Sequence, residues 1–309
     1  MFVADSSPRP VPVQRHQVSL DELVSLRHWP PARGHSSERM AIREGHHLSH
    51  VRARGMEYDD VREYQPGDDI RHLDWRLMAR TGDAYTKLYR EERERPVFVM
   101  ADMRPGMHFA TRGHYKAVLA AYAAAMVVWT TLANGDRVGG RVLQQYHGGL
   151  FKPSNNRQQA MQMIAALSEP FTTPAPDTGS SSSLASQLIE VEALLGSGTI
   201  VYLFSDFHDA DALLQQHLMR LAQRCELKLV LISDPMEQQL PAGRRLRFAG
   251  EGRDIVVEGN QQQQALFQAQ FQQRLAMLEQ LRNLRGVEFA HWHSNHHPLF
   301  VTDGVGDGL

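Results

Sequence analysis

The chain has 309 residues, 42% hydrophobic and 22% charged, which is ordinary globular composition and length enough to bury a sizeable core. Its formal net charge of −2 provides no overall field that would draw the protein onto nucleic acid or an anionic membrane. The single cysteine, Cys225, excludes an internal disulfide framework and favours a reducing compartment, so we expect a cytoplasmic protein.

Residues 1–33 mix Pro, Arg and Ser and contain no long apolar run of the kind that a signal peptide needs. Within them, the stretch SLDELVSLRHW predicts a short amphipathic helix. Ser19 is placed to cap this helix, and Glu22 lies at the spacing of a capping box. We expect this segment to be a loosely attached arm.

Residues 34–95 are dense in charged side chains and end in the run REERER at 90–95. A stretch with so few apolar residues cannot build its own core, so we expect a charged extension that packs on another part of the chain. Pro66 and Gly67 predict a turn, and Trp75 is a large potential anchor. Charges of both signs follow at helical spacing, namely Arg71, Asp74, Arg76 and Arg80. Two interpretations remain open: a salt-bridged clamp on a sheet edge, or a docking face.

From residue 96 to 300, strand and helix signals alternate, which predicts an α/β, Rossmann-like doubly wound sheet that is mostly parallel. A short tail, 301–309, follows it. Strands are expected at 97–101, 137–144, 150–152, 199–206, 227–234 and 286–292, with the second and third forming a hairpin at one edge. Helices are expected at 113–132, 156–167, 184–195, 209–224 and 261–285.

The segment from Ala117 to Ala133 carries no charged residue and could be mistaken for a membrane span. It is shorter than the roughly 20 residues that cross a bilayer, and it lies between a strand signal and the turn at 134–136. We therefore expect a helix buried against the sheet, and no membrane span in this chain.

The usual catalytic and nucleotide-binding fingerprints are absent from the sequence. No GxGxxG links a strand to a helix, and there is no GxxxxGK[ST] loop, GxSxG elbow or HExxH helix. Sheet architecture alone says nothing of function, so this pattern favours a binding protein and not an enzyme.

In doubly wound sheets of strand order 3-2-1-4-5-6, a crevice opens beyond the carboxyl ends of strands one and four. Here those ends are ADMRPGM at 101–107 and SDFHDAD at 205–211, so Asp102 and Asp206 are expected to face each other. Two carboxylates about 4 Å apart repel by about 4 kcal/mol at an effective dielectric near 20. A cation or a proton must therefore lie between them.

At this point the module resembles a von Willebrand factor A domain. The resemblance implies a metal-ion-dependent adhesion site, in which Asp-x-Ser-x-Ser after the first strand and residues of two further loops hold Mg²⁺. Carried over, the site falls on Asp102, Arg104, Gly106, Ser182 and Asp206. Both serines are missing, and Arg104 would place a guanidinium where the metal should lie and balance Asp102 and Asp206. We expect a degenerate site without metal or cofactor. The alternatives are weak Mg²⁺ binding through Asp102, Ser182 and Asp206, or ordinary loop caps.

A long ordered block at 55–102 resembles the signature of the bacterial family known as domain of unknown function 58, and DPMEQQLPAG at 234–243 also fits. The matching residues include Arg62, Tyr64, Pro66, Gly67, Asp68, Asp69, Arg71, Asp74, Trp75 and Arg80. The resemblance implies a partner of the MoxR-type AAA+ ATPases. It predicts a non-enzymatic adaptor or assembly factor that contacts that ATPase and its client proteins through the crevice.

Two other groups of residues suggest rival functions. Four histidines in HWHSNHH, namely His291, His293, His296 and His297, could bind Zn²⁺ and would make the protein a metal-dependent hydrolase. Exposed histidines without a ligand are the simpler interpretation. Arginines at 33, 39, 43, 52 and 54 could contact phosphates, but glutamates interleave with them, so no nucleic-acid partner is expected.

Overall fold

The computed structural model describes residues 16–28, 56–65, 68–91, 95–144, 149–170, 182–241, 245–250 and 253–296. The chain divides into two compact units. The larger unit comprises residues 1–35 and 95–309, and the smaller one residues 36–94.

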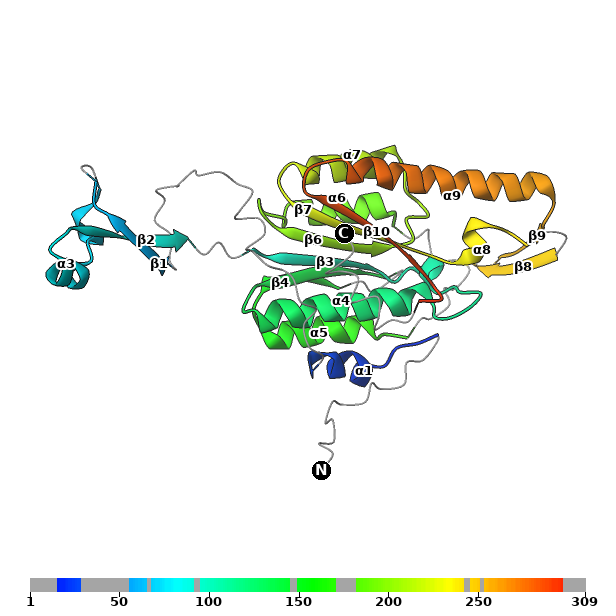
Figure 1. Ribbon diagram of the computed structural model, residues 1–309. Helices are drawn as coiled ribbons and strands as arrows, with labels where there is room; N and C mark the ends of the chain where they lie inside the picture. Colours follow the sequence, from blue (N-terminus) through cyan, green and yellow to red (C-terminus); the bar gives the residue numbers. More distant parts are fainter. Residues whose placement is uncertain are drawn as a thin grey trace, which may run out of the picture. The chain divides into compact units, whose positions relative to one another are not determined.

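A six-stranded sheet forms the centre of the larger unit (Figure 1). Its strands are β3 (Val97–Asp102), β4 (Val138–Leu143), β5 (Leu150–Ser154), β6 (Ile200–Ser205), β7 (Glu226–Ser233) and β10 (Val287–His293). They lie in the order β10-β7-β6-β3-β4-β5, and every neighbouring pair is parallel except β4 with β5. Counted along the chain, this is the order 3-2-1-4-5-6 read from the other edge. The expected α/β class, mostly parallel sheet and edge hairpin are confirmed.

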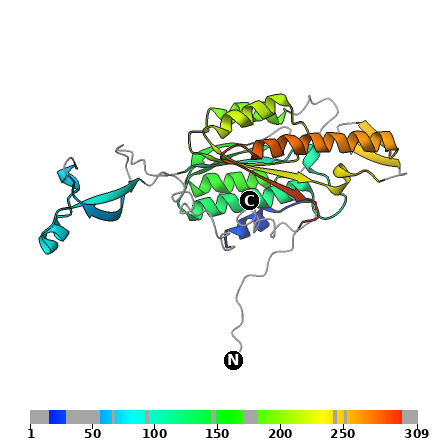
Figure 2. The same cartoon turned by 45° about the horizontal axis from the view of Figure 1, so that its top comes forward.

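Helices cover both faces of the sheet (Figure 2). They are α1 (Leu20–Ser25), α4 (Lys116–Ala133), α5 (Arg157–Leu167), α6 (Leu184–Glu192), α7 (Ala212–Ala222), α8 (Pro235–Gln238) and α9 (Gln261–Arg282), with short 3₁₀ turns η1 (Leu26–His28) and η3 (Pro105–Met107). A separate hairpin, β8 (Arg245–Gly250) with β9 (Arg253–Glu258), precedes α9.

Strand β3 shows why its sequence is a continuous apolar run. All six of its residues are buried, and successive side chains point to opposite faces of the sheet. Val97 and Val99 therefore enter the core beneath α4 and α5, while Phe98 and Met100 enter the core beneath α6, α7 and α9. A central strand covered on both faces has no polar side to display.

Helix α4 is long and apolar enough to cross a membrane, judged by length and composition alone. In the structure 72% of it is buried inside the protein, and it packs against β3, β6 and β7. The expectation of a helix buried against the sheet is confirmed.

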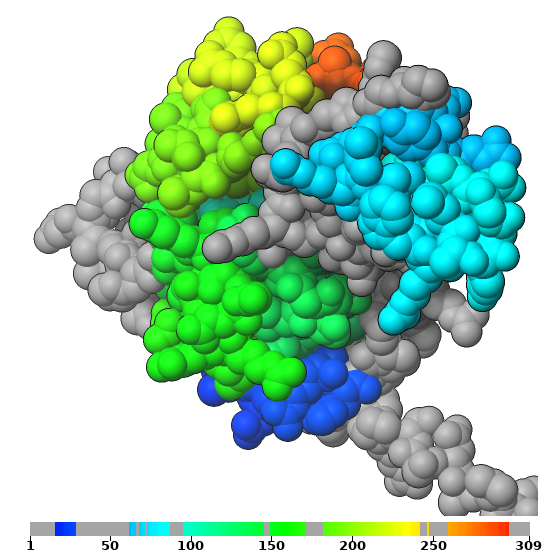
Figure 3. All heavy atoms as spheres, turned by 90° about the vertical axis from the view of Figure 1, so that its left-hand side faces the viewer, coloured from blue at the N-terminus to red at the C-terminus, as the bar shows by residue number. Residues whose placement is uncertain are grey.

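The N-terminal helix α1 begins at the expected capping box. Ser19 Oγ accepts a hydrogen bond from Glu22 N at 3.2 Å, and the Glu22 carboxylate accepts one from Ser19 N at 2.8 Å. Leu23 is fully buried, and Trp129 Nε1 of α4 donates to its carbonyl oxygen at 2.9 Å. Figure 3 shows α1, in blue, against the green residues of α4 and α5. Residues 16–28 are therefore packed against the module, in contrast to the loose attachment expected for this arm.

The smaller unit is built on an antiparallel hairpin of β1 (Met56–Glu63) and β2 (Tyr85–Glu91), with η2 (Ile70–His72) and α3 (Trp75–Thr81) between the strands. Asp74 caps α3 by accepting hydrogen bonds from Arg76 N and Leu77 N at 3.0 and 3.1 Å. Gly82 ends that helix with φ of 85°, a left-handed conformation that glycine adopts without strain.

The family-signature residues of this unit form local contacts. Asp68 makes an ion pair with Arg62 at 2.6 Å, and Asp69 accepts a hydrogen bond from Arg71 N at 3.0 Å. Pro66 and Gly67 lie outside the described residues. The packing of this extension on the sheet module stays a prediction.

Candidate functional site

The site lies where the chain leaves β3 and β6 toward opposite faces of the sheet. These strands are parallel neighbours, so their carboxyl ends meet at one edge, and the connections diverge to α4 and α7. Asp102 is the last residue of β3, and Asp206 follows the last residue of β6. Their exposed fractions are 0% and 1%, so both carboxylates need partners within the protein.

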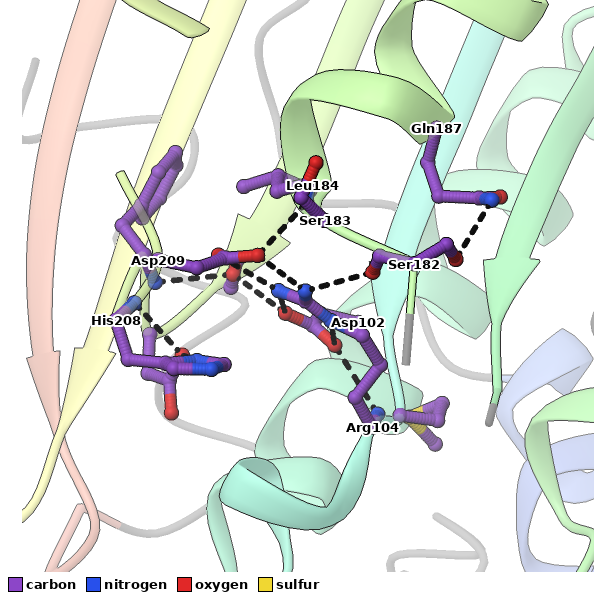
Figure 4. A network of polar contacts seen from close by, with 12 residues as sticks. Asp102, Arg104, Ser182, Ser183, Leu184, Gln187, His208 and Asp209 are labelled. Atoms are coloured by element: carbon purple, nitrogen blue, oxygen red, sulfur yellow. Dashed lines mark hydrogen bonds and ion pairs between the residues drawn. The ribbon is translucent and has the colours of Figure 1, made fainter. Parts of the chain in front are cut away.

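Arg104 is the central side chain of the site, with an exposed fraction of only 2% (Figure 4). Its Nε and Nη2 donate to the two oxygens of Asp102 at 2.9 and 2.8 Å. Nη2 and Nη1 donate to the two oxygens of Asp209 at 3.1 and 2.6 Å, and Nη1 also donates to Ser182 O at 3.2 Å. A guanidinium has five N–H groups, and all five are used here. The expected pairing with Asp102 is present, but the second carboxylate is Asp209 and not Asp206.

The carboxylate oxygens of Asp102 and Asp209 also accept hydrogen bonds from groups other than the Arg104 guanidinium. Asp102 also accepts from Arg104 N at 3.1 Å and from Ser205 Oγ at 2.6 Å, and Asp209 accepts from Leu184 N at 2.8 Å. Burial by itself would raise the pKa of Asp209, but the bonds from Arg104 outweigh it and lower that pKa. Burial would likewise lower the pKa of Arg104, and its carboxylate partners raise it. Both shifts favour the charged forms of Arg104 and Asp209.

Asp206 has a different cation. Lys116, the first residue of α4 and 1% exposed, donates from Nζ to Asp206 Oδ2 at 2.7 Å and also contacts Glu237. His208 Nδ1 lies 2.9 Å from Asp206 Oδ1. Although burial would raise the pKa of Asp206, Lys116 and His208 hold it well below its usual range. The bond to Asp206 raises the pKa of His208.

Gly106 and Ser182 take part in ways that differ from the metal-site pattern. A Cβ at Gly106 would lie 3.2 Å from Asp206 Oδ2, so any side chain here would crowd that carboxylate. Ser182 reaches Arg104 through its backbone carbonyl, while its hydroxyl accepts from Gln187 Nε2 at 2.8 Å. The structure thus groups Asp102, Arg104 and Ser182 in one network, and places Asp206 beside Gly106 in another.

These residues do not suit Mg²⁺. The ion requires six oxygen ligands in near-octahedral geometry, and the carboxylate oxygens that could supply them already accept bonds from Arg104, Lys116 and His208. An ion would have to displace buried cations that carry the same sign of charge. The donor set fits a site whose carboxylates are paired with cationic side chains of the protein itself.

Phe207 turns the loop between Asp206 and His208 and has φ of 49°, which is rare for a bulky residue and costs of order 1–3 kcal/mol. Its ring is fully buried in the core beneath α7, and its N–H donates to Ser205 Oγ at 3.0 Å. Arg274 of α9 donates to the Asp206 carbonyl at 2.8 Å. Packing and hydrogen bonds from both sides therefore hold this strained turn in place.

Three of the four C-terminal histidines come together at the end of β10. The ring centroids of His291 and His293 lie 4.5 Å apart, and those of His293 and His296 lie 5.4 Å apart. Ser233 Oγ is 2.8 Å from His291 Nε2. Burial and the neighbouring imidazoles lower the pKa of His291 to about 4. Among the described residues, which do not include His297, no group of three or more His, Cys, Asp or Glu is placed to hold a metal ion.

Lys116, Asp209 and Glu237 are among the members of the site that sequence reasoning missed. Each carried a visible signal. Lys116 is the charged residue directly before an uncharged helix, Asp209 lies in the carboxylate-rich SDFHDAD, and Glu237 lies in DPMEQQLPAG. Those signals identify charged residues, but they do not show which cation forms an ion pair with which carboxylate.

Comparison with known proteins adds the following. The model of a family described as "Protein of unknown function DUF58" matches residues 60–279. Uncharacterized proteins of Mycobacterium tuberculosis and Mycobacterium bovis are each 27% identical over 200 residues, which cover 65% of this chain and 62% of each relative. The chain thus spans less than two thirds of the length of those relatives.

Two solved structures share a weak likeness with this chain. An aerotolerance-related membrane protein from Bacteroides fragilis is 10% identical, with a TM-score of 0.33 over 66% of this chain and 95% of that one. Proximal thread matrix protein 1 from the mussel byssus is 16% identical, with a TM-score of 0.33 over 45% of this chain and 37% of that one. Scores at this level carry no argument about function.

Proposed function

Because this chain belongs to the DUF58 family, whose matched region includes α3 and the site around Arg104, we propose that it is a non-enzymatic adaptor that binds proteins at the crevice above β3 and β6. The observation that carries the proposal is the buried Arg104 guanidinium, which is bonded through all five of its N–H groups. Such a site is preformed and needs no cofactor to hold its shape.

We assign the module to the von Willebrand factor A type. Support comes from the strand order 3-2-1-4-5-6, with the third strand in chain order, β5, antiparallel at the edge. Further support comes from the position of Asp102, Arg104 and Gly106, which follow the first strand where that fold has its metal-binding loop. In this proposal the adhesion site is degenerate, with Arg104 and Lys116 in the role of the ion.

The partner touches the rim of the crevice and not Arg104 itself, whose donors are all used. The rim offers Ser182 and Ser183, both exposed, and His208, whose side chain is 45% exposed. The side chains of Asp209 and Glu237 are 22% and 23% exposed. Arg104 positions the loops that carry these groups and does not itself touch the partner.

The proposed partner is a MoxR-type AAA+ ATPase together with its client proteins, in the cytoplasm. Its support is the family resemblance of the signature block at 55–102. In that role the chain would present a client to the motor, or hold the motor at a client complex.

The test is binding of the purified chain to the co-encoded ATPase. We expect the rim variant Ser183→Trp/His208→Ala to bind at least tenfold more weakly, about 1.4 kcal/mol, because it blocks and removes contact groups. His28→Ala, exposed on the far side of α4, is the matched control and should bind as the wild type does.

Chelation adds a second measurement to the same assay. Binding should be unchanged by EDTA, because the carboxylates of the site already accept hydrogen bonds from Arg104 and Lys116. The proposal would be contradicted if the wild-type chain did not bind the ATPase, or if it bound the ATPase only in the presence of Mg²⁺.

A metal-dependent hydrolase is the second candidate; its motivation is the proximity of His291, His293 and His296, although these described side chains are not placed to hold one metal ion together. This reading predicts stoichiometric zinc in untagged protein, lost in His291→Ala/His293→Ala. Zinc-free protein that still binds the ATPase would dismiss it.

A further inference from the structure

Helix α3 of the smaller unit presents one continuous exposed stripe. Trp75, Arg76, Ala79 and Arg80 are all exposed, while Leu77 and Met78 are half-buried. At 100° per residue these four positions span about 140° of the helix circumference, with Ala79 between Trp75 and the two arginines. A small residue at the centre of this stripe leaves the indole and both guanidinium groups accessible together.

The apolar part of this stripe is large for a solvent-facing surface. The exposed fraction of Trp75 is 58%, and that of Ile70, in the turn before α3, is 60%. Among the side chains described in this unit, Leu73 is the buried hydrophobic one. A surface that displays a tryptophan beside two arginines has the composition of a contact surface, because Trp and Arg dominate the binding energy of protein interfaces.

The charged part indicates what the partner carries. Within the described part of the chain, no ion pair reaches Arg71, Arg76 or Arg80. Arginine forks match carboxylates bidentately, so the complementary surface is acidic. Residues 36–94 contain 11 Lys and Arg against 13 Asp and Glu, so the unit as a whole has no positive field for a nucleic acid or an anionic membrane.

We propose that the α3 face, defined as Trp75, Arg76, Ala79 and Arg80, docks on an acidic protein surface with a recess that accepts the Trp75 indole. The inference rests on the proposed function, because the partner that carries this surface is the ATPase. The chain then contacts that ATPase at two places, the α3 face and the crevice rim. The α3 face supplies the apolar anchor that the polar rim lacks.

The experiment measures the affinity of the full-length chain for the purified ATPase at low and high salt. Trp75→Ala should weaken binding at least 30-fold. Arg76→Glu/Arg80→Glu should weaken it at least tenfold and flatten its salt dependence, since the lost attraction is electrostatic. Leu266→Ala, which removes an apolar side chain of the same 58% exposed fraction from α9, is the control for Trp75. Arg157→Glu, exposed at the start of α5, is the control for the charge reversals.

The outcomes separate the two proposals. If the wild type binds and the crevice-rim variant weakens binding while Trp75→Ala does not, the α3 face is overturned and the proposed function stands. If the wild type does not bind the ATPase, both fall. A lower unfolding midpoint for Trp75→Ala, with unchanged ATPase affinity, would show that the chain's own residues cover this face. If Trp75→Ala lost binding to anionic vesicles but kept its affinity for the ATPase, the α3 face would be a membrane-binding surface. Either of these two results overturns the proposal.

Discussion

At the carboxyl ends of β3 and β6, buried carboxylates are paired with buried cations, whereas at the carboxyl ends of β7 and β10 the buried groups have neutral partners. Asp234, fully buried after β7, accepts hydrogen bonds from Thr111 N at 2.8 Å, Thr111 Oγ1 at 2.6 Å and Ser294 Oγ at 2.6 Å. The two regions hold similar groups on one edge of one sheet. A single substitution at the ends of β3 and β6 therefore leaves an unpaired charge inside the protein. At the ends of β7 and β10 it removes only hydrogen bonds.

The largest expected effect is that of Arg104→Met. Removal of the guanidinium leaves the buried Asp102 and the half-buried Asp209 without a counter-charge, which costs about 3–5 kcal/mol of the free energy of unfolding. Denaturant unfolding measures this loss. Arg220→Met, at a side chain 62% exposed, is the control and should cost less than about 0.5 kcal/mol. Adding Asp209→Asn should recover part of the loss, and a loss below about 1 kcal/mol for Arg104→Met would show that the site is not an ionic network.

Asp234→Asn should have a smaller effect, about 2 kcal/mol. The amide keeps one acceptor oxygen but cannot satisfy all the donors of Thr111 and Ser294, and no buried cation is left unpaired. The same unfolding experiment compares it with Asp83→Asn, an exposed control in the smaller unit. Equal losses for Asp234→Asn and Arg104→Met would remove the distinction between the two ends of the sheet.

The smallest expected effect is the change in the free energy of unfolding at acid pH, to which His291 and His208 contribute with opposite signs. His291, with a folded pKa of about 4 and an ordinary value of 6.5, binds a proton more readily when unfolded, so stability is lost as the pH falls below 6.5. His208 has a raised folded pKa, so its contribution is present below pH 6.5 and is lost as the pH rises through the folded pKa.

The measurement is the free energy of unfolding at pH 7 and pH 5. Discounted for partial exposure, His291 contributes about 1 kcal/mol to the loss between these values, and His291→Gln should abolish that share. His208→Gln should make the acid loss larger. His28→Gln, exposed in η1, is the control. Parallel profiles for the His291 variant and the wild type would contradict the assignment.

The sheet could be predicted from sequence because its evidence is local. Strand β3 reads as a short apolar run, and the uncharged length of α4 followed by a turn sets a helix boundary to within a few residues. The adjacency of Asp102 and Arg104 was also accessible, since two residues in one loop must lie close together. The partner of Asp206 was not, because Lys116 reaches it from 90 residues away only after α4 has packed.

The choice of Asp209 over Asp206 as the second partner of Arg104 was beyond sequence reasoning for a related reason. These carboxylates lie three positions apart in the chain, and the left-handed turn at Phe207 decides which of them faces the guanidinium. Nothing in the identity of a phenylalanine predicts a positive φ. The loose attachment expected for the first residues differed from the structure because the hydrogen bond from Trp129 to Leu23 links positions far apart in the chain.

The cover that α1 provides for α4 has a consequence during synthesis. The ribosome releases α4 before β6, β7 and β10 have been made, so most of the sheet that later hides this uncharged helix does not yet exist. Only earlier segments can then shield it, and in the finished protein β3, η1 and α1 are such segments that contact it. Deletion of α1 should therefore affect the nascent chain more than the folded protein. We expect more binding by chaperones and more aggregation before the last strand completes the fold.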